Sequence, residues 1–591
     1  MSGSSGQRWV SGATGVGGTE SDAGPASWGY AAEPQAEADL GEPADLREPA
    51  DPRETADPRE TADLREPADP SEPAPPKAES SRRWAWPAGY AVAAIVLFLC
   101  YLRISGTQAV TSDGASIALG AWDMMHGNWL LTGWKLTDVS FYTTELPEYI
   151  LVELFRGLGP ADVHVSAAIT YTLLVLLAGL LAKGNKTGRE GLIRVLIASG
   201  IMIAPQVGPG AFLLLLSSDH TGTGVPLLLI FLVLDRAPRR PWVPPLIGLM
   251  LVWAEVGDDL VITIGAAPIV LVCLVRAYQG IVQRREPWRN RAFELWLAAA
   301  AIVSVGVADL VVKVIRHLGG YITAPLNTTL APSATWPAHI ALTAEGVLGL
   351  YGADVTGRTL GLYVGIALLH LVGLALAVWA TGGVIRRFFS CDDLIAQVLA
   401  VAIIVNICAF TFSVLPNTFW DNREIASVLA FGAVLAGRRL AERLTAARLL
   451  PLLAAVGCCY LVALGYGITR PQTAAHDQDL SNWLTSHHLT TGLGSYADGN
   501  SLILDSHGNL QVYAPFWSAT TVRPGTHETQ ASQFDPSLHY ANFVVSTSVN
   551  GPAFYIPPAW IIRDFGTPAH TYHYGVWTIM TWSKNLLTDL R

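Results

Sequence analysis

Apolar segments of membrane-spanning length recur along most of this chain, with polar loops between them. A helix needs about 20 apolar residues to cross the hydrocarbon core of a bilayer. The pattern therefore predicts a mainly α-helical, polytopic membrane protein with about eleven transmembrane helices within residues 84–469. The predicted spans lie at about 84–103, 163–182, 191–216, 223–235, 242–256, 260–278, 292–315, 358–380, 393–415, 424–437 and 447–468.

Basic side chains are distributed unevenly over the loops of this predicted bundle. Lysine and arginine precede the first span and gather after the second, fourth, sixth, eighth and tenth spans, whereas acidic residues concentrate in the intervening loops. Cytoplasmic loops of membrane proteins carry an excess of lysine and arginine. The alternation predicts a multi-pass plasma-membrane protein with a cytoplasmic N-terminus. The odd number of spans then places residues 470–591 on the extracytoplasmic side.

The first 83 residues hold most of the net charge. The whole chain carries a formal net charge of −10, and residues 1–83 contain 17 acidic and 8 basic residues. Residues 42–77 are six-residue repeats, from EPADLR to EPAPPK. Proline at this density opposes helix formation, and so little apolar surface cannot offset chain entropy. We expect residues 1–83 to form a disordered acidic cytoplasmic tail. The nearly neutral remainder has no basic surface of the kind that binds nucleic acid.

Residues 470–591 differ from the rest in being rich in polar, aromatic, glycine and proline residues. A segment of about 120 residues suffices for one small domain. Alternating apolar positions predict strands, and a helical periodicity precedes them. We therefore expect a small extracytoplasmic α/β domain. Its predicted elements are a helix at 476–488, a hairpin within 501–516 that turns at 506–509, and strands at 542–547, 559–565 and 572–582.

The long first outer loop, residues 104–162, carries the first candidates for chemistry. Its apolar spacing predicts two amphipathic helices, and Asp113 and Glu145 lie at their starts, with Glu148 close behind. A carboxylate at the membrane surface can accept a proton from an acceptor hydroxyl, or hold a divalent metal near a lipid phosphate. Alternatively, Ser112 or Asp113 caps the first helix, and the two glutamates are solvated acids favoured by the helix dipole.

Three further groups of polar residues lie in predicted outer loops. Asp219 and His220 precede the glycine-rich stretch TGTG, and Asp258 lies in the acidic turn between two short spans. The first group is a candidate for binding a phosphate or a sugar, and the second for binding a metal or a sugar hydroxyl. Each is also compatible with a simple turn. Arg423 opens a late span and is a candidate phosphate ligand, because a guanidinium holds phosphate through two hydrogen bonds. A surface network with Asp421 and Glu424 is the alternative. Arg316 is a second phosphate candidate.

The motifs of the first outer loop resemble those of a known family. An acidic residue soon after the first span, the pattern A-x-x-A-W-D-M-x-x-G at 118–127 and the proline-containing TELPE at 144–148 are similar to GT-C-fold glycosyltransferases, such as the protein O-mannosyltransferases and the aminoarabinose lipid A transferase. The resemblance implies a polyprenyl-phosphate sugar as donor, Asp113 as base or metal ligand, and Arg423 as the ligand of the donor phosphate. Asp113-Gly114 replaces the common Asp-Glu pair of the family, and Leu146-Pro147 replaces its Pro-Pro.

Together these observations predict a GT-C-like membrane enzyme that transfers a sugar from a polyprenyl-phosphate donor to an envelope glycan or protein acceptor on the outer face, in contact with membrane lipids. A lipid or glycan transporter, or a non-catalytic scaffold with a glycan-binding outer domain, is the alternative. The predicted cofactor, if any, is Mg²⁺ or Mn²⁺ held by Asp113. The predicted catalytic residues are Asp113 and Glu145, and the predicted substrate-binding residues are Glu148, Asp219, His220, Asp258, Arg316 and Arg423.

Overall fold

The computed structural model describes residues 79–325, 329–446, 449–473, 478–548 and 554–590. The predicted acidic tail, 1–83, therefore lies outside the described residues as far as residue 78. The first helix, α1 (Glu79–Ser105), begins within the last residues of the predicted tail, and its part long and apolar enough to cross a membrane begins at Trp86.

Seven described helices are long and apolar enough to cross a membrane. Other helices cover the remaining predicted spans: α5 (Gly188–Met202), α6 (Pro209–Leu215), α7 (Gly224–Arg236), α8 (Val243–Gly257) and α14 (Ser427–Ala446). The seven long ones comprise α1, α4 (Ala161–Lys183), α9 (Ala267–Tyr278) with a π-helical turn at each end, α10 (Ala292–His317), α12 (Leu362–Arg386), α13 (Leu394–Phe412) and α15 (Leu450–Ile468).

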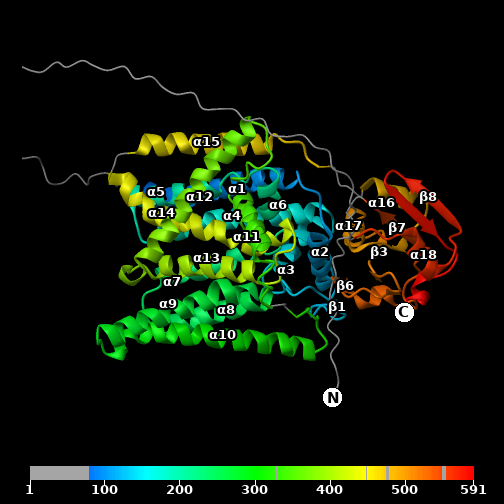
Figure 1. Cartoon of the computed structure of the whole chain (residues 1–591), viewed down its shortest axis with the longest axis horizontal. Helices are drawn as coiled ribbons and strands as arrows, with labels where there is room; N and C mark the ends of the chain where they lie inside the picture. The colour runs from blue at the N-terminus through cyan, green and yellow to red at the C-terminus, as the bar shows by residue number, and fades with distance from the viewer. Residues whose placement is uncertain (1–78, 326–328, 447–448, 474–477, 549–553, 591) are drawn as a thin grey trace, which may run out of the picture. The chain divides into compact units, whose positions relative to one another are not determined.

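Two parts of the predicted span pattern need correction. The segment 191–216 is not one helix, because it breaks between α5 and α6, where Pro205 lacks an amide hydrogen and Gly208 adopts a φ of 101°. The segment after α10, predicted as an outer loop, contains the helix α11 (Trp336–Leu350). In Figure 1 the helices α8, α9, α10 and α13 lie side by side, and the contacts among them agree with this arrangement.

The first outer loop contains both predicted helices, α2 (Ser112–Met125) and α3 (Leu146–Arg156). The helix α2 is capped by Thr111, whose side chain accepts a hydrogen bond from the backbone nitrogen of Gly114 at 3.5 Å. The alternative in which Ser112 or Asp113 caps this helix is therefore wrong. Because Thr111 serves as the cap, the Asp113 carboxylate is available for other partners.

The C-terminal α/β domain is built on a five-stranded sheet in the order β3-β2-β7-β9-β8. β2 pairs in parallel with β3 and β7, and β9 pairs antiparallel with β7 and β8. The strands are β2 (Thr491–Leu493), β3 (Gln511–Tyr513), β7 (Phe543–Thr547), β8 (His570–Tyr574) and β9 (Trp577–Thr581), with helices α16 (Gln478–Ser486), α17 (Tyr496–Asp505) and α18 (Pro558–Phe565).

Several predicted elements of this domain are confirmed and two are wrong. The helix α16 and the strand β7 lie where they were expected, and the predicted strand 572–582 is a hairpin of β8 and β9. The predicted hairpin within 501–516 is instead the helix α17 followed by β3, and the predicted strand 559–565 is the helix α18. Short apolar runs do not distinguish a strand from a buried helix, and the proline at the start of α18 suits the first turn of a helix.

The C-terminal domain contacts the first outer loop through both a helix and a short strand. The helix α17 packs against α2, as Figure 1 also shows. In addition, the short strand β1 (Trp134–Lys135) of the loop pairs antiparallel with β6 (Thr529–Gln530) of the domain. These contacts bring residues from the end of the sequence next to Asp113.

Candidate active site

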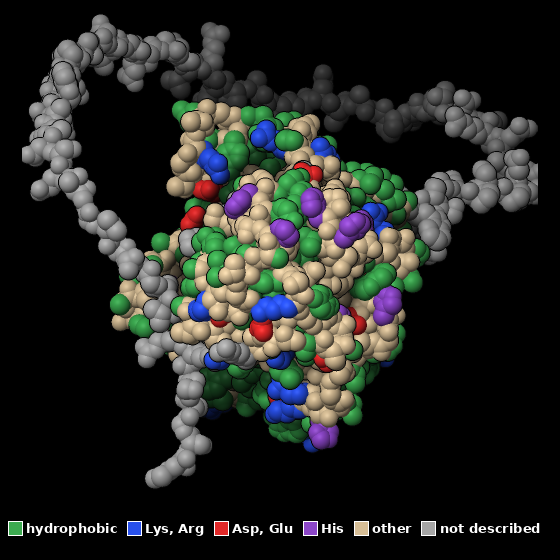
Figure 2. Space-filling model, turned by 90° about the vertical axis from the view of Figure 1, so that its right-hand side faces the viewer, with side chains coloured by type: hydrophobic (Ala, Val, Ile, Leu, Met, Phe, Trp, Pro, Cys, Tyr) green, Lys and Arg blue, Asp and Glu red, His purple; other side chains and the backbone are tan. Residues whose placement is uncertain are grey.

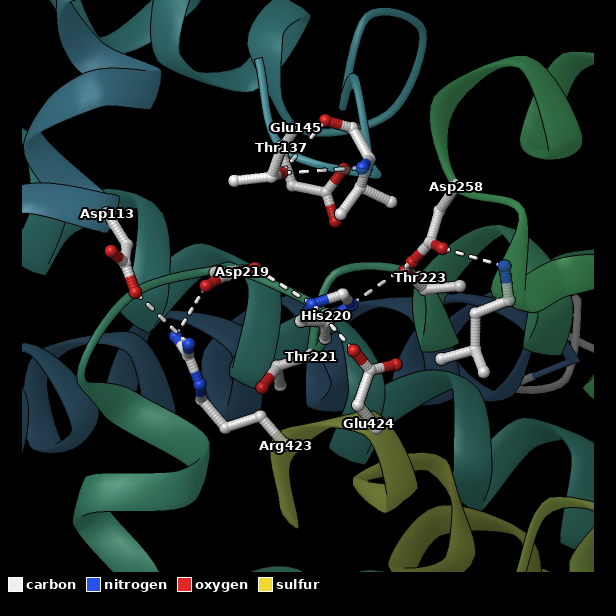
Figure 3. A network of polar contacts seen from close by, with 12 residues as sticks. Asp113, Thr137, Glu145, Asp219, His220, Thr221, Thr223, Asp258, Arg423 and Glu424 are labelled. Atoms are coloured by element: carbon white, nitrogen blue, oxygen red, sulfur yellow. Dashed lines mark hydrogen bonds and ion pairs between the residues drawn. The ribbon is translucent and has the colours of Figure 1, made fainter. Parts of the chain in front are cut away.

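Arg423 lies at the centre of an ion-pair network that joins three distant parts of the sequence (Figure 3). Its Nη2 is 3.2 Å from Oδ2 of Asp113, and its Nη1 donates a hydrogen bond to Oδ2 of Asp219. The ring of Trp420 lies 3.8 Å from the guanidinium carbon and supports the cation through its π face. Arg423 and Asp219 are buried, whereas the Asp113 side chain is 24% exposed. Asp113 is therefore the member of this group that a substrate can reach.

The short 3₁₀ segment Phe419–Ile425 holds Arg423 in place. A capping box fixes its start: Asp421 accepts hydrogen bonds from the backbone nitrogens of Thr418, at 2.7 Å, and of Asn417, at 2.8 Å. The side chain of Asn422 packs against Gly346 of α11, where any Cβ would collide with it. The surface network predicted as the alternative is thus wrong for Asp421, which caps the segment rather than pairing with Arg423.

His220 lies among three carboxylates next to this ion pair. Its ring nitrogens are 3.3 Å from Oε1 of Glu424, 3.5 Å from Oδ1 of Asp219 and 3.6 Å from Oδ2 of Asp258. Burial alone lowers the pKa of the imidazole, but the charges of Glu424, Asp219 and Asp258 outweigh it and raise the pKa well above its usual range. His220 is therefore an imidazolium at neutral pH, a second cation of the site.

The backbone at His220 is also unusual. Its φ of 54° lies in the left-handed region, as does the φ of 51° at Phe141, whose ring meets the imidazole edge-on at 5.7 Å. Non-glycine residues adopt this conformation at a cost of order 1 kcal/mol, and such residues cluster at functional sites. The tight turn between α6 and α7 imposes this conformation and directs the imidazole into the network.

Asp258 joins the end of α8 to the start of α7. It accepts hydrogen bonds from the backbone nitrogen of Leu260, at 2.8 Å, and from the hydroxyl of Thr223. In the same cluster, burial raises the pKa of Glu424 to about 7, an effect that the His220 cation partly offsets. The predicted residues Asp113, Asp219, His220, Asp258 and Arg423 therefore meet in one place, and we call them, with Glu424, the Arg423 network.

Glu145 lies next to this network and is almost completely buried. It accepts a hydrogen bond from Thr144 and packs directly on Gly222, where a Cβ would collide with its carboxylate. Burial, reinforced by the charges of Asp258 and Asp219, raises the pKa of Glu145 well above its usual range. Glu145 is therefore a neutral acid at neutral pH and not the solvated carboxylate of the alternative interpretation.

Two predicted binding residues have their partners elsewhere. Glu148 accepts a hydrogen bond from the hydroxyl of Thr170 on α4 at 2.9 Å, and burial raises its pKa to about 8. Arg316, at the exposed end of α10, donates to Thr323 at 3.3 Å. Among the described residues, neither forms a hydrogen bond or ion pair with the Arg423 network, and neither lines the cavity described below.

Two residues of the C-terminal domain complete the site, and neither was predicted. The Tyr496 hydroxyl donates to Oδ1 of Asp113 at 2.5 Å and also contacts the carboxyl group of Glu528. Burial raises the pKa of Glu528 well above its usual range, and the nearby charge of Asp113 adds to the shift. A hydroxyl has one proton to donate, so Tyr496 serves one of these two carboxyl groups at a time and links Asp113 to Glu528.

A sequence signal for Tyr496 does exist. Ser495 is followed three residues later by Asp498, the spacing of a capping box that opens a helix. In the structure the Ser495 hydroxyl donates to the Asp498 carboxylate at 2.6 Å, and α17 begins at Tyr496. Glu528 has no such signal, since it lies in an irregular segment with a φ of 47°.

A cavity of about 350 Å³ opens beside His220. Its lining combines acidic residues and His220 with apolar residues, several of which come from α13. The charged members are Asp138, His220, Asp258, Asp259 and Glu424, and the apolar members include Leu330, Ala409, Phe410, Phe412 and Leu415.

The residues present do not form a recognisable metal centre. Both carboxylate oxygens of Asp113 are engaged, one by Arg423 and one by Tyr496. Within the described ranges, no three His, Cys, Asp or Glu side chains are grouped so as to hold a metal ion. This holds also for the histidines that gather on the face of the molecule shown in Figure 2. In the C-terminal domain, His487 stacks on Trp483, with 3.8 Å between ring centroids.

The chain is similar to solved membrane-protein structures. It matches ArnT from Cupriavidus metallidurans bound to undecaprenyl phosphate at 12% identity and a TM-score of 0.50, over 84% of this chain and 98% of that one. It also matches the oligosaccharyltransferase of Archaeoglobus fulgidus in its apo form at 14% identity and a TM-score of 0.46, over 79% of this chain and 70% of that one. No protein-family model and no curated protein sequence matches the chain. The likeness to ArnT shows the fold: this is a GT-C-like polytopic membrane protein.

Proposed function

We propose that this protein transfers a sugar from a polyprenyl-phosphate donor to a hydroxyl-bearing acceptor, an envelope glycan or protein, at the outer face of the plasma membrane. The observation that carries this proposal is the Arg423 network itself. On a GT-C-like fold, it combines a partly exposed carboxylate, Asp113, with two cations, Arg423 and His220, and its members His220, Asp258 and Glu424 line a cavity that also has apolar residues. The proposed orientation, with the N-terminus in the cytoplasm, rests on the loop charges.

Asp113 is the proposed general base. The acceptor hydroxyl attacks C1 of the donor sugar, its proton passes to Asp113, and the bond from C1 to the phosphate oxygen breaks. The polyprenyl phosphate leaves with the bonding electrons. A correctly placed base contributes roughly 10²- to 10⁴-fold to such a step. Arg423 and Tyr496 each hold one oxygen of the carboxylate and thereby orient it.

The donor phosphate is proposed to bind between the two cations. His220 lines the cavity directly. Arg423 retains one unused donor, because its buried Nε has no hydrogen-bond partner among the described residues. The neutral acid Glu145, packed against the turn that carries Asp219 and His220, is proposed to assist by keeping this turn in place and by supplying a proton to the leaving phosphate.

The lining of the cavity suits both parts of such a donor, its sugar and its lipid. Carboxylates such as Asp138, Asp258 and Asp259 accept hydrogen bonds from sugar hydroxyls. The apolar residues of the lining, such as Phe410 and Phe412 of α13, fit the first isoprene units of a lipid. No step is assigned to Mg²⁺ or Mn²⁺, because Arg423 and Tyr496 already occupy the oxygens of the proposed ligand Asp113.

The direct test incubates the purified full-length protein with labelled polyprenyl-phosphate hexoses and pentoses, and measures both transfer to acceptors and donor hydrolysis. We expect at least one donor to be consumed, and Asp113→Asn to lower that rate by about 10²-fold or more. The matched control is Asp479→Asn, an exposed acid of α16, which should leave the rate unchanged. Absence of transfer and hydrolysis across the panel, combined with donor movement across vesicles, would favour the transporter instead.

A further inference from the structure

A second group of charged residues lies at the ends of α12 and α14 that are remote from the Arg423 network. The helix α14 begins at Ser427, three residues after Glu424. With a rise of 1.5 Å per residue, Arg439 and Arg443 lie about 18 and 24 Å further along it. A cavity of about 230 Å³ is present there between the two helices. We call it the arginine pocket, and its lining includes Trp379, Arg386, Arg387, Arg438, Arg439 and Arg443.

One of the five arginines serves the fold. Arg438 is 2.6 Å from Asp235 and 2.9 Å from Asp393, and it donates to the carbonyl of Leu181 at 2.7 Å. Its charge is thereby neutralised, and its guanidinium joins α4, α7, α13 and α14. Arg438 is therefore not available to a ligand.

The other four arginines differ from Arg438 in their partners. Among the described residues, Arg386, Arg387, Arg439 and Arg443 form no ion pair, although the pocket wall contains one carboxylate, that of Glu442. The guanidinium of Arg443 lies over the ring of Trp379, 4.7 Å from its centroid. Four cations around one small cavity repel one another, and an anion bound among them relieves that repulsion.

The surroundings of the pocket indicate what kind of anion fits. Guanidinium groups match phosphate oxygens through paired hydrogen bonds. Next to the arginines, α12 exposes apolar side chains: Val378 is 62% exposed, and Ile385, seven residues along on the same face, is 37% exposed. A ligand for this place therefore needs a phosphate and an apolar part. This combination disfavours a soluble peptide or a free phosphate.

We propose that the arginine pocket binds the phosphodiester headgroup of an anionic phospholipid, whose acyl chains lie along the exposed face of α12. Basic pockets between transmembrane helices are known to hold such headgroups, and each nearby basic residue strengthens the attraction. The proposal does not depend on the proposed transferase activity, because the pocket shares no residue with the Arg423 network.

The test measures lipid binding to the full-length protein, purified in detergent and stripped of lipid. Native mass spectrometry counts bound dioleoyl phosphatidylglycerol and, in parallel, bound dioleoyl phosphatidylcholine. The test variant is Arg387→Gln/Arg439→Gln, which leaves Arg438 intact. The matched control is Arg284→Gln/Arg285→Gln, two exposed arginines in the loop after α9. If the double variant does not fold, Arg439→Gln alone replaces it.

We expect phosphatidylglycerol to bind wild type and control more tightly than phosphatidylcholine does, and the test variant to lose about tenfold or more of that affinity. Equal binding of both lipids, or an unchanged affinity in the variant, would overturn the proposal. Two competition arms distinguish the sources of the anion. Displacement of the lipid by inorganic phosphate would reassign the pocket to a soluble anion. Displacement by a synthetic peptide of residues 42–77 would reassign it to the acidic N-terminal segment.

Discussion

The two ends of α14 carry charge in opposite ways. At its start, the Arg423 network combines cations and carboxylates that come from distant parts of the chain, and half of its six members are buried. At its other end, the arginine pocket contains five arginines and one glutamate from two neighbouring helices, and Arg386, Arg387 and Arg443 are exposed. The cations of the first group are paired with carboxylates, whereas, among the described residues, four of the five arginines of the second group form no ion pair.

This difference separates two uses of charge in a membrane protein. Burying a charge is costly unless it is paired, so each member of the Arg423 network is held in a defined position by its partners. Such a network suits chemistry, which needs fixed atoms. Exposed cations need no partner within the protein and can bind an external anion. Loss of one member should therefore disturb the first group as a whole and the second only locally.

Removing the central cation should have the largest effect. Arg423→Gln leaves Asp113 and Asp219 without their shared partner, and loss of one member of a buried ion pair costs about 3–5 kcal/mol. We expect a fall in thermal stability and, if transfer occurs, a fall in rate of about 10²-fold or more. Arg423→Lys should rescue little, because one ammonium cannot bridge two carboxylates as a guanidinium fork does.

The double variant Arg423→Gln/Asp219→Asn separates stability from activity. Because it removes a buried anion together with the cation, it should recover much of the thermal stability of the wild type but not the transfer rate. Scanning fluorimetry measures the first, and labelled-donor turnover the second. If Arg423→Gln alone is as stable as wild type, the network is not the buried unit described here.

Crowding the turn at Gly222 should have the next largest effect. A methyl group at this position collides with the Glu145 carboxylate, and overpacking of this kind costs about 1–3 kcal/mol. Gly222→Ala should therefore lower stability and displace the turn that carries Asp219 and His220. Gly200→Ala is the control, since a Cβ there meets no atom within 4 Å. Equal melting temperatures for the two variants would show that Glu145 is free to move away.

Features that depend on local sequence were predictable, whereas contacts between distant residues were not. The apolar runs located the helices, because the period of a helix is local, and unusual charges at predicted outer loop positions marked Asp113, Asp219, His220, Asp258 and Arg423 one by one. Their pairing was not predictable. Arg423 and Asp113 are 310 residues apart, and nothing in local patterning says which loops meet.

The missed residues had a different cause. Tyr496 belongs to α17, whose short apolar run predicts a strand, and a strand at this position does not predict the contact between α17 and α2. The single span predicted at 191–216 is wrong for a related reason. Residue types and average hydropathy show which secondary structures a segment can form. Contacts with distant parts of the chain then decide which of them it forms.

Tyr496→Phe tests whether the C-terminal domain belongs to the site. The substitution removes only the hydroxyl that donates to Asp113. Hydrogen bonds to charged groups contribute about 1.5–3 kcal/mol, so the transfer rate should fall by about 10-fold or more. Tyr540→Phe is the control, since its hydroxyl bonds the carbonyl of Ser583 on the exposed surface. A rate equal to that of the control would leave α17 a purely structural neighbour of α2.

Stability should depend on pH through the carboxyl groups near the Arg423 network and not through the arginine pocket, because arginine does not titrate in proteins. Burial raises the pKa of Glu148 to about 8, against about 4.3 in an unfolded chain. Between these values the folded state holds a proton that the unfolded state has lost. The stability that this proton confers is complete below pH 4 to 5 and is lost as the pH rises through 8.

We therefore expect the melting temperature to fall between pH 6 and 8, with Glu148 contributing up to about 1.4 kcal/mol per pH unit. Glu148→Gln keeps the shape of the side chain but cannot ionise, so its stability should vary less steeply with pH. The exposed Glu345→Gln of α11 should retain the slope of the wild type. Parallel curves for all three proteins would mean that Glu148 is already ionised in the folded state, and that charge on this side of the molecule is less firmly buried than its contact with Thr170 indicates.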